Sequence, residues 1–84
     1  MPPYEIEWLA EARADVRALD RATAMRIFEG IFRFARSGSG DVVALQGELA
    51  PALRLRLGGY RVLFSLEGDD MRIFGVRHRS EVYR

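Results

Sequence analysis

Residues 53–66 read LRLRLGGYRVLFSL and predict a β-hairpin. Apolar side chains occupy every second position on both sides of Gly58-Gly59, which is typical of two strands that bury one face. Two glycines between such runs favour a two-residue turn, because both of its central residues adopt positive φ. The turn fixes the register of the hairpin, whose opposed pairs are Leu57 with Tyr60, Arg56 with Arg61, Leu55 with Val62, and Arg54 with Leu63.

This register separates an apolar face from a basic one. The leucines share the apolar face with Tyr60, Val62 and Phe64, and the other face carries Arg54, Arg56 and Arg61. Like charges directly opposed on a ladder destabilise it by several tenths of a kcal/mol, roughly, and neither strand carries an acid before Glu67. We interpret the basic face as a phosphate-binding surface, since guanidinium groups bind phosphate as a planar fork. The alternative is a solvated face whose arginines protect the sheet from aggregation. On either interpretation, we expect the loss of Arg61 to leave stability unchanged or slightly raised.

The residues before the hairpin predict one strand and two helices. Residues 3–8 alternate apolar and acidic side chains and predict a half-buried strand. From Leu9 to Leu19 the apolar spacing becomes helical, without a strong N-cap and with Glu11, Asp15 and Arg17 pointing outward. Asp20 is a good N-cap for a second helix. Its apolar stripe consists of Ala24, Ile27, Phe28, Ile31, Phe34 and Ala35.

Two positions in the second helix stand out. Gly30 lies inside the apolar stripe, where it costs about 1 kcal/mol relative to alanine, and we expect it to allow a close approach between the two helices. Phe32 lies off the stripe and is expected to be exposed.

The rest of the chain completes a two-layer fold. Residues 37–41 form a short loop, after which Val42, Val43 and Leu45 are expected to pack under the helices. Residues 71–77 predict a last strand with Gly75 as a bulge site. The predicted order is β-α-α-β-β-β, an α+β fold with the helix pair on one face of a mainly antiparallel sheet. Residues 1–84 are expected to form a single domain.

Composition excludes several classes of protein. The chain has no cysteine and one histidine, so disulfide scaffolds, cysteine-based zinc sites and thiol nucleophiles are excluded, and we expect no metal and no cofactor. No apolar run approaches the roughly 20 residues of a membrane span, and the N-terminus lacks the features of a signal peptide, so we expect a cytoplasmic protein. All 13 basic residues are arginine. The formal net charge is −2 for residues 1–50 and +3 for residues 51–84. This uneven distribution favours a local anion-binding site in the second segment.

The whole chain resembles the RelE/ParE superfamily of toxins from bacterial and archaeal toxin–antitoxin pairs. The matching segments are YEIEW, A-x-x-D-V-R-A-L-D, LRLRLGGYRVLFSL and RIFGVRHRSEVYR, in this order. The GGYR and RSEVYR segments together favour the RelE branch, which cleaves messenger RNA, over the ParE branch, which poisons DNA gyrase. The resemblance implies a compact β-α-α-β-β-β fold, an antitoxin that wraps the toxin, and cleavage of messenger RNA in the ribosomal decoding site. It further implies contact with operator DNA only through the antitoxin, and no membrane partner.

The resemblance also assigns residues. It places the family's basic pair on Arg54 and Arg56, its GYR arginine on Arg61, its arginine upstream of SEVY on Arg77, and its tyrosine on Tyr83. The best-known members have lysine where this chain has Arg54 and Arg56, and arginine is a poor proton shuttle. The expected catalytic set is therefore Arg56, Arg61, Arg77 and Tyr83, with Arg54, Arg56 and Arg79 binding RNA phosphates and His78 as a further candidate acid or base.

Two mechanisms follow from this resemblance. In the first, an RNA 2′-hydroxyl attacks the adjacent phosphate and expels the 5′-oxygen, and the arginines stabilise the growing charge. Proton transfer falls to Tyr83 or to His78, whose imidazole is the easier acid or base near neutral pH. In the second, the chain inhibits DNA gyrase by binding alone. In both cases we expect an acidic, partly disordered antitoxin that masks Arg56 and Arg61.

Overall fold

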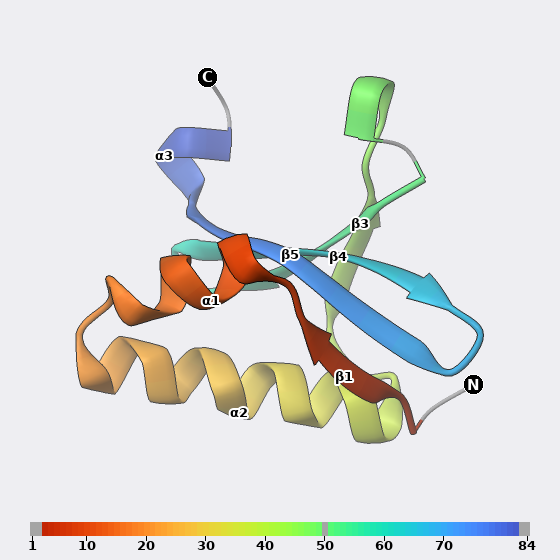
Figure 1. The fold of residues 1–84 in the computed structure, drawn as a ribbon, viewed down its shortest axis with the longest axis horizontal. Coiled ribbons are helices and arrows are strands. Elements are labelled where there is room, and N and C mark those ends of the chain that lie inside the picture. The colour runs from red at the N-terminus through yellow and green to blue at the C-terminus, as the bar shows by residue number, and fades with distance from the viewer. Residues whose placement is uncertain (1–2, 50, 83–84) are drawn as a thin grey trace.

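A five-stranded mixed sheet with two helices on one face makes up the fold (Figure 1). It was obtained as a computed structural model, which describes residues 3–49 and 51–82. The strand order is β1-β5-β4-β3-β2, with β1 parallel to β5 and every other pair antiparallel. Along the chain the elements are β1 (Glu5–Trp8), α1 (Ala10–Arg17), α2 (Arg21–Ser37), β2 (Asp41–Ala44), the 3-10 turn η1 (Gly47–Leu49), β3 (Leu53–Leu57), β4 (Tyr60–Glu67), β5 (Asp70–His78) and α3 (Arg79–Val82).

The predicted α+β class and the predicted hairpin register are both confirmed. All four opposed pairs expected around Gly58-Gly59 occur between β3 and β4. Strand β2 was not predicted; it pairs with β3 and forms one edge of the sheet. Val42 packs against the core from β2, but Val43 is 45% exposed, so its expected place under the helices was wrong. Neighbours in a strand point to opposite faces, and only one of the two valines can reach the helices.

The helix ends follow local chemistry. Helix α1 begins after Leu9 without a side-chain cap, as predicted. Helix α2 begins after Asp20, whose carboxylate accepts hydrogen bonds from the Thr23 backbone N–H at 3.1 Å and the Thr23 hydroxyl at 2.6 Å. It ends at Ser37 and is capped by Gly38, which has a φ of 77° and donates its N–H to the Phe34 carbonyl. A left-handed residue at this point favours glycine, which carries no Cβ.

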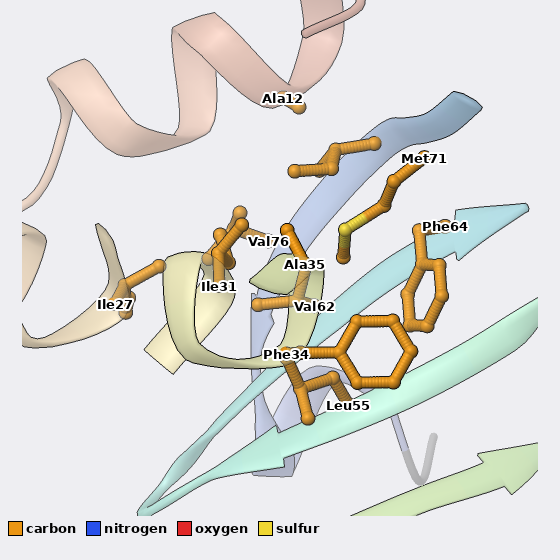
Figure 2. Packing of buried hydrophobic residues seen from close by; sticks show 11 residues of the cluster. Ala12, Ile27, Ile31, Phe34, Ala35, Leu55, Val62, Phe64, Met71 and Val76 are labelled. Carbon is orange, nitrogen blue, oxygen red and sulfur yellow. The ribbon is translucent and has the colours of Figure 1, made fainter. Parts of the chain in front are cut away.

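The core lies between α2 and the sheet (Figure 2). Phe34 of α2 stacks on Tyr4 at a ring-centroid distance of 5.8 Å and tilts against Phe64 of β4 at 5.3 Å. These contacts tie the first residues of the chain, the long helix and a central strand into one apolar layer. The buried members of the cluster are Ala12, Ile27, Ile31, Phe34, Ala35, Leu55, Val62, Phe64, Met71, Ile73 and Val76.

Gly30 allows a close approach, but not the expected one. A Cβ at this position would lie 2.4 Å from Cδ2 of Leu57, a side chain of β3. The close approach is therefore between α2 and the sheet, and the expectation of a helix–helix contact was wrong. Phe32, as predicted, is exposed, at 53%.

The last strand is irregular near the predicted bulge. Leu63 lies opposite Gly75 and Phe64 opposite Ile73, so Phe74 is an extra residue in β5. The shift keeps Ile73 and Val76 on the core face and turns Gly75 and Arg77 to the other side of the sheet. In the part of the chain that the structure describes, no helix is long and apolar enough to cross a bilayer.

Candidate functional site

Three arginines from three neighbouring strands form one row across the sheet. Arg56 of β3 lies opposite Arg61 of β4, which lies opposite Arg77 of β5. Opposed residues of antiparallel strands share a face, and this face is the one away from α2 and the apolar core. Arg54 lies on the same face of β3, and Asp41 of β2 is the register partner of Arg56. We call Arg56, Arg61 and Arg77 the arginine row.

Arg61, the central member, is buried. Its residue is 2% exposed, and its Nη1 donates hydrogen bonds to the carbonyls of Gly58 at 3.1 Å and Tyr60 at 3.0 Å. The guanidinium therefore holds the β3–β4 turn from beneath. The alternating sequence pattern does not reveal this burial. Because Arg61 is buried and hydrogen-bonded, its loss is no longer expected to leave stability unchanged. Arg56 is exposed, whereas Arg77 and the neighbouring Arg54 are half-buried, so Arg56 is the member of the row that solvent reaches most easily.

Arg77 is held by an acid that the sequence reading misplaced. Asp15 was expected to point outward from α1, but its Oδ2 forms an ion pair with Arg77 Nη1 and accepts a hydrogen bond from the Val76 N–H at 2.9 Å. Helical periodicity counts Asp15 as polar and outward because it does not show which side of α1 meets the edge of β5. The only sequence signal was its place in the A-x-x-D segment of the resemblance.

His78, a candidate acid or base near the C-terminus, lies apart from the arginine row. His78 is the register partner of Tyr60, and the two rings meet edge to face at 5.3 Å. Because successive strand residues alternate, its side chain lies on the other face of β5 from Arg77. The His78 Nδ1 accepts a hydrogen bond from the Ser80 backbone N–H at 3.3 Å and lies 3.0 Å from the Ser80 hydroxyl.

Two further candidates belong to the chain end. Arg79 opens α3, where its backbone N–H donates to the Gly59 carbonyl at 2.8 Å and its side chain is exposed. Figure 1 shows α3 on the side of the sheet away from α2, and α3 contacts β4 and β5. Tyr83 lies outside the described residues.

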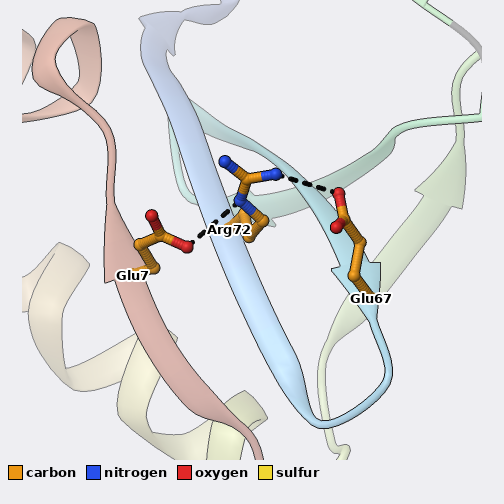
Figure 3. A network of polar contacts seen from close by, with 3 residues as sticks. All are labelled: Glu7, Glu67 and Arg72. Atoms are coloured by element: carbon orange, nitrogen blue, oxygen red, sulfur yellow. Dashed lines mark hydrogen bonds and ion pairs between the residues drawn. The ribbon is translucent and has the colours of Figure 1, made fainter.

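A fifth arginine on the same face is neutralised locally. Arg72 of β5 bridges Glu7 of β1 and Glu67 of β4, with both nitrogen–oxygen distances at 3.1 Å (Figure 3). The hydrogen bond to Glu67 and the charge of Glu7 raise the pKa of Arg72. The two ends of this face thus differ. The end near the β4–β5 turn pairs its arginine with two carboxylates, and the other end gathers arginines in excess.

Charge and geometry define what this site could do. Guanidinium groups grouped on one sheet face stabilise an anion without a metal, as a fixed arrangement of donors does in oxyanion and phosphate sites. Among residues 3–49 and 51–82, no group of three or more histidine or carboxylate side chains lies close enough to hold a metal ion. A separate groove of about 360 Å³ lies between α2 and the hairpin turn, lined in part by Arg26, Arg33 and Tyr60, and it is on the opposite side of the sheet from the row.

Comparisons with known proteins agree with this architecture. The family described as "ParE toxin of type II toxin-antitoxin system, parDE" matches residues 6–83. The crystal structure of the RelBE2 toxin–antitoxin complex from Mycobacterium tuberculosis is similar, with a TM-score of 0.82 and 28% identity over 92% of this chain and 99% of the other. No curated protein matches the chain.

Two archaeal structures share the fold at lower identity. The RelE–RelB complex from Pyrococcus horikoshii has a TM-score of 0.74 at 22% identity, covering 92% of this chain and 96% of the other. The RelB–RelE complex from Methanococcus jannaschii has a TM-score of 0.72 at 22% identity, covering 90% and 93%.

Proposed function

We propose that this chain, which belongs to the RelE/ParE superfamily of type II toxins and is the toxin of a toxin–antitoxin system, cleaves messenger RNA on the ribosome and so stops translation. The observation that supports cleavage is the arginine row, in which like charges are opposed across two successive ladders. Asp15 pairs with Arg77 and Asp41 lies opposite Arg56, so two carboxylates offset part of the positive charge of this face, and an RNA phosphate would complement the rest.

The reaction needs no group beyond the protein and the RNA. The 2′-oxygen bonds to the adjacent phosphorus, the bond from phosphorus to the 5′-oxygen breaks, and the products are a 2′,3′-cyclic phosphate and a 5′-hydroxyl. One proton leaves the 2′-hydroxyl and one is given to the 5′-oxygen. We assign charge stabilisation to Arg56, Arg61 and Arg77. We assign proton transfer to Tyr83, because the side chain of His78 lies on the other face of β5 from Arg77.

Because Arg61 is buried and Arg56 is exposed, we assign the two arginines different roles. Arg56 is exposed and takes direct contact with the scissile phosphate, while Arg61 contributes its charge from beneath the turn that it also supports. Arg54 and Arg79 would hold neighbouring phosphates of the RNA strand. The reaction takes place in the cytoplasm, where ribosomes and messenger RNA are found.

A second candidate function is inhibition of DNA gyrase by binding alone. The family name that matches residues 6–83 supports this candidate, since it refers to ParE. The two candidates differ in what the arginine row is for, because gyrase inhibition requires a partner surface but no stabilised transition state.

The proposed partner that neutralises the toxin is an acidic antitoxin. The similar structures from Mycobacterium tuberculosis and Methanococcus jannaschii are complexes of toxin with antitoxin. For this chain we propose an acidic segment that covers the arginine row at Arg56, since the excess charge there complements carboxylates. A structure of the complex with the antitoxin lying wholly away from Arg56 and Arg61 would refute this placement.

One experiment separates the two functions. Messenger RNA on ribosomes is incubated with the purified chain, and new 5′ ends are mapped with and without it, while a supercoiling assay follows gyrase. We expect new 5′ ends within codons and unaffected supercoiling. Inhibited supercoiling without new 5′ ends would establish the second function instead.

A further inference from the structure

An acid of α1 contacts the arginine row from outside the sheet. The Asp15 carboxylate pairs with Arg77, although the two residues are 62 positions apart in the sequence. Their side chains are 27% and 32% exposed, so the pair is largely shielded from solvent. Salt screens a shielded pair less than one on an open surface, and this contact is therefore suited to hold a fixed geometry.

The backbone of β5 explains why the carboxylate lies there. β1 pairs with β5 only from Asp70 to Ile73, so Val76 lies beyond the end of β1. Its N–H would be an unsatisfied donor at the sheet edge, which is costly in a partly buried place. Asp15 accepts this N–H with the same oxygen that meets Arg77, and the carboxylate is thereby fixed relative to the strand.

The guanidinium of Arg77 also lies against Gly75. A Cβ at Gly75 would lie 3.1 Å from Arg77 Nη1, so the guanidinium passes directly over this glycine. Both hydrogen bonds that Arg77 donates to the described residues, to Asp15 and to the Val76 carbonyl, use Nη1. Because a guanidinium is a rigid plane with five donors, fixing Nη1 sets the direction of the donors on Nη2 and Nε.

We propose that Asp15 is a positioning residue, which holds the Arg77 guanidinium at the angle that presents Nη2 and Nε to the phosphate bound by the arginine row. The inference rests on the proposed function, because it takes an RNA phosphate as the ligand of that row. Its physical basis is preorganisation: a donor already oriented by a second residue stabilises developing charge without having to reorient during the reaction.

The kinetic test compares two carboxylates of the same helix. Asp15→Asn keeps an oxygen for the Val76 N–H but removes the charge that holds Arg77. We expect kcat for ribosome-dependent cleavage to fall roughly 10-fold to 100-fold, as for a misplaced contact, with KM for the ribosome unchanged. Glu11→Gln, an exposed acid one turn earlier in α1, makes the same change in charge and should leave kcat unchanged.

A double-variant cycle then asks whether Asp15 acts through Arg77. In an Arg77→Gln background, Asp15→Asn should lower kcat less than about 2-fold, because residues that share one interaction are not additive. Equal losses in both backgrounds would overturn the proposal, since Asp15 would then act by another route.

An NMR measurement makes the result independent of cleavage. The ¹⁵Nε resonance of Arg77 should shift in Asp15→Asn and not in Glu11→Gln. Addition of a short single-stranded RNA should shift the same resonance in the wild-type chain, and should shift it less in Asp15→Asn. An unchanged resonance and an unchanged kcat in Asp15→Asn would overturn the positioning role. A wild-type chain that cuts no messenger RNA would refute the proposed function, and the resonance and its RNA titration would still decide the role of Asp15.

Discussion

Arg56 and Arg61 face each other directly across the β3–β4 ladder, yet Arg56 is exposed and Arg61 is 2% exposed. The difference arises because Arg61 turns its guanidinium back to the carbonyls of Gly58 and Tyr60. The two arginines are equivalent in the predicted hairpin register but differ in solvent exposure, so they should respond differently to substitution.

Arg61→Ala should destabilise the fold. It removes two charge-assisted hydrogen bonds to partly buried turn carbonyls and leaves a cavity where the buried guanidinium lay, which together cost about 1–3 kcal/mol. Urea unfolding measures this loss. Cleavage should fall at least about tenfold, beyond what the smaller folded fraction explains. If the variant unfolds at the wild-type urea concentration, the turn contacts make no net contribution to stability.

Arg56→Ala should affect activity alone. The side chain is exposed, and its removal relieves repulsion with Arg61, so stability should stay unchanged or rise by a few tenths of a kcal/mol, roughly. Ribosome-dependent cleavage should fall about tenfold, since one charge-stabilising contact is lost. The matched control is Arg36→Ala, which removes an exposed arginine of α2 far from the row and should cleave normally. Equal cleavage by the two variants would exclude Arg56 from the site.

Gly30→Ala should destabilise the chain by about 1 kcal/mol. Alanine favours a helix over glycine by about 1 kcal/mol, but its Cβ would lie 2.4 Å from Leu57 Cδ2, and overpacking costs about 1–3 kcal/mol. In a Leu57→Ala background the clash is gone, so the same substitution should become stabilising. Thermal unfolding of the four proteins measures the reversal of sign, and its absence would show that Leu57 moves aside at no cost.

The N-cap of α2 should make stability depend on pH in the acid range. Hydrogen bonds from the Thr23 hydroxyl and backbone N–H lower the pKa of Asp20 below its usual value of 3.8. A carboxyl whose pKa is lower in the folded state stabilises the fold above its unfolded pKa, and this contribution is lost as pH falls through its folded pKa.

Asp20→Asn tests the prediction, because asparagine caps without titrating. The difference in melting temperature between wild type and this variant should shrink or change sign below about pH 4, near the unfolded pKa of an aspartate. A difference that stays constant from pH 7 to pH 2 would contradict the assignment.

The sequence alone determined the parts of the fold that depend on near neighbours. A two-residue turn at Gly58-Gly59 sets the whole β3–β4 register, and Asp20 caps α2 through a residue three positions away. Period-two and helical spacing distinguish the strands from the helices because each is a property of the backbone over a few residues. The opposition of Arg56 and Arg61 was predictable for the same reason.

Only the tertiary structure decided where distant segments meet. Strand β2 was missed because four residues, one of them an exposed valine, form a strand only by pairing with β3. The contact of Asp15 with Arg77 depends on where β1 ends along β5, and the burial of Arg61 depends on which way its side chain turns on the closed hairpin. Each is a long-range packing outcome, and the periodicity of a single segment carries no information about what packs against it.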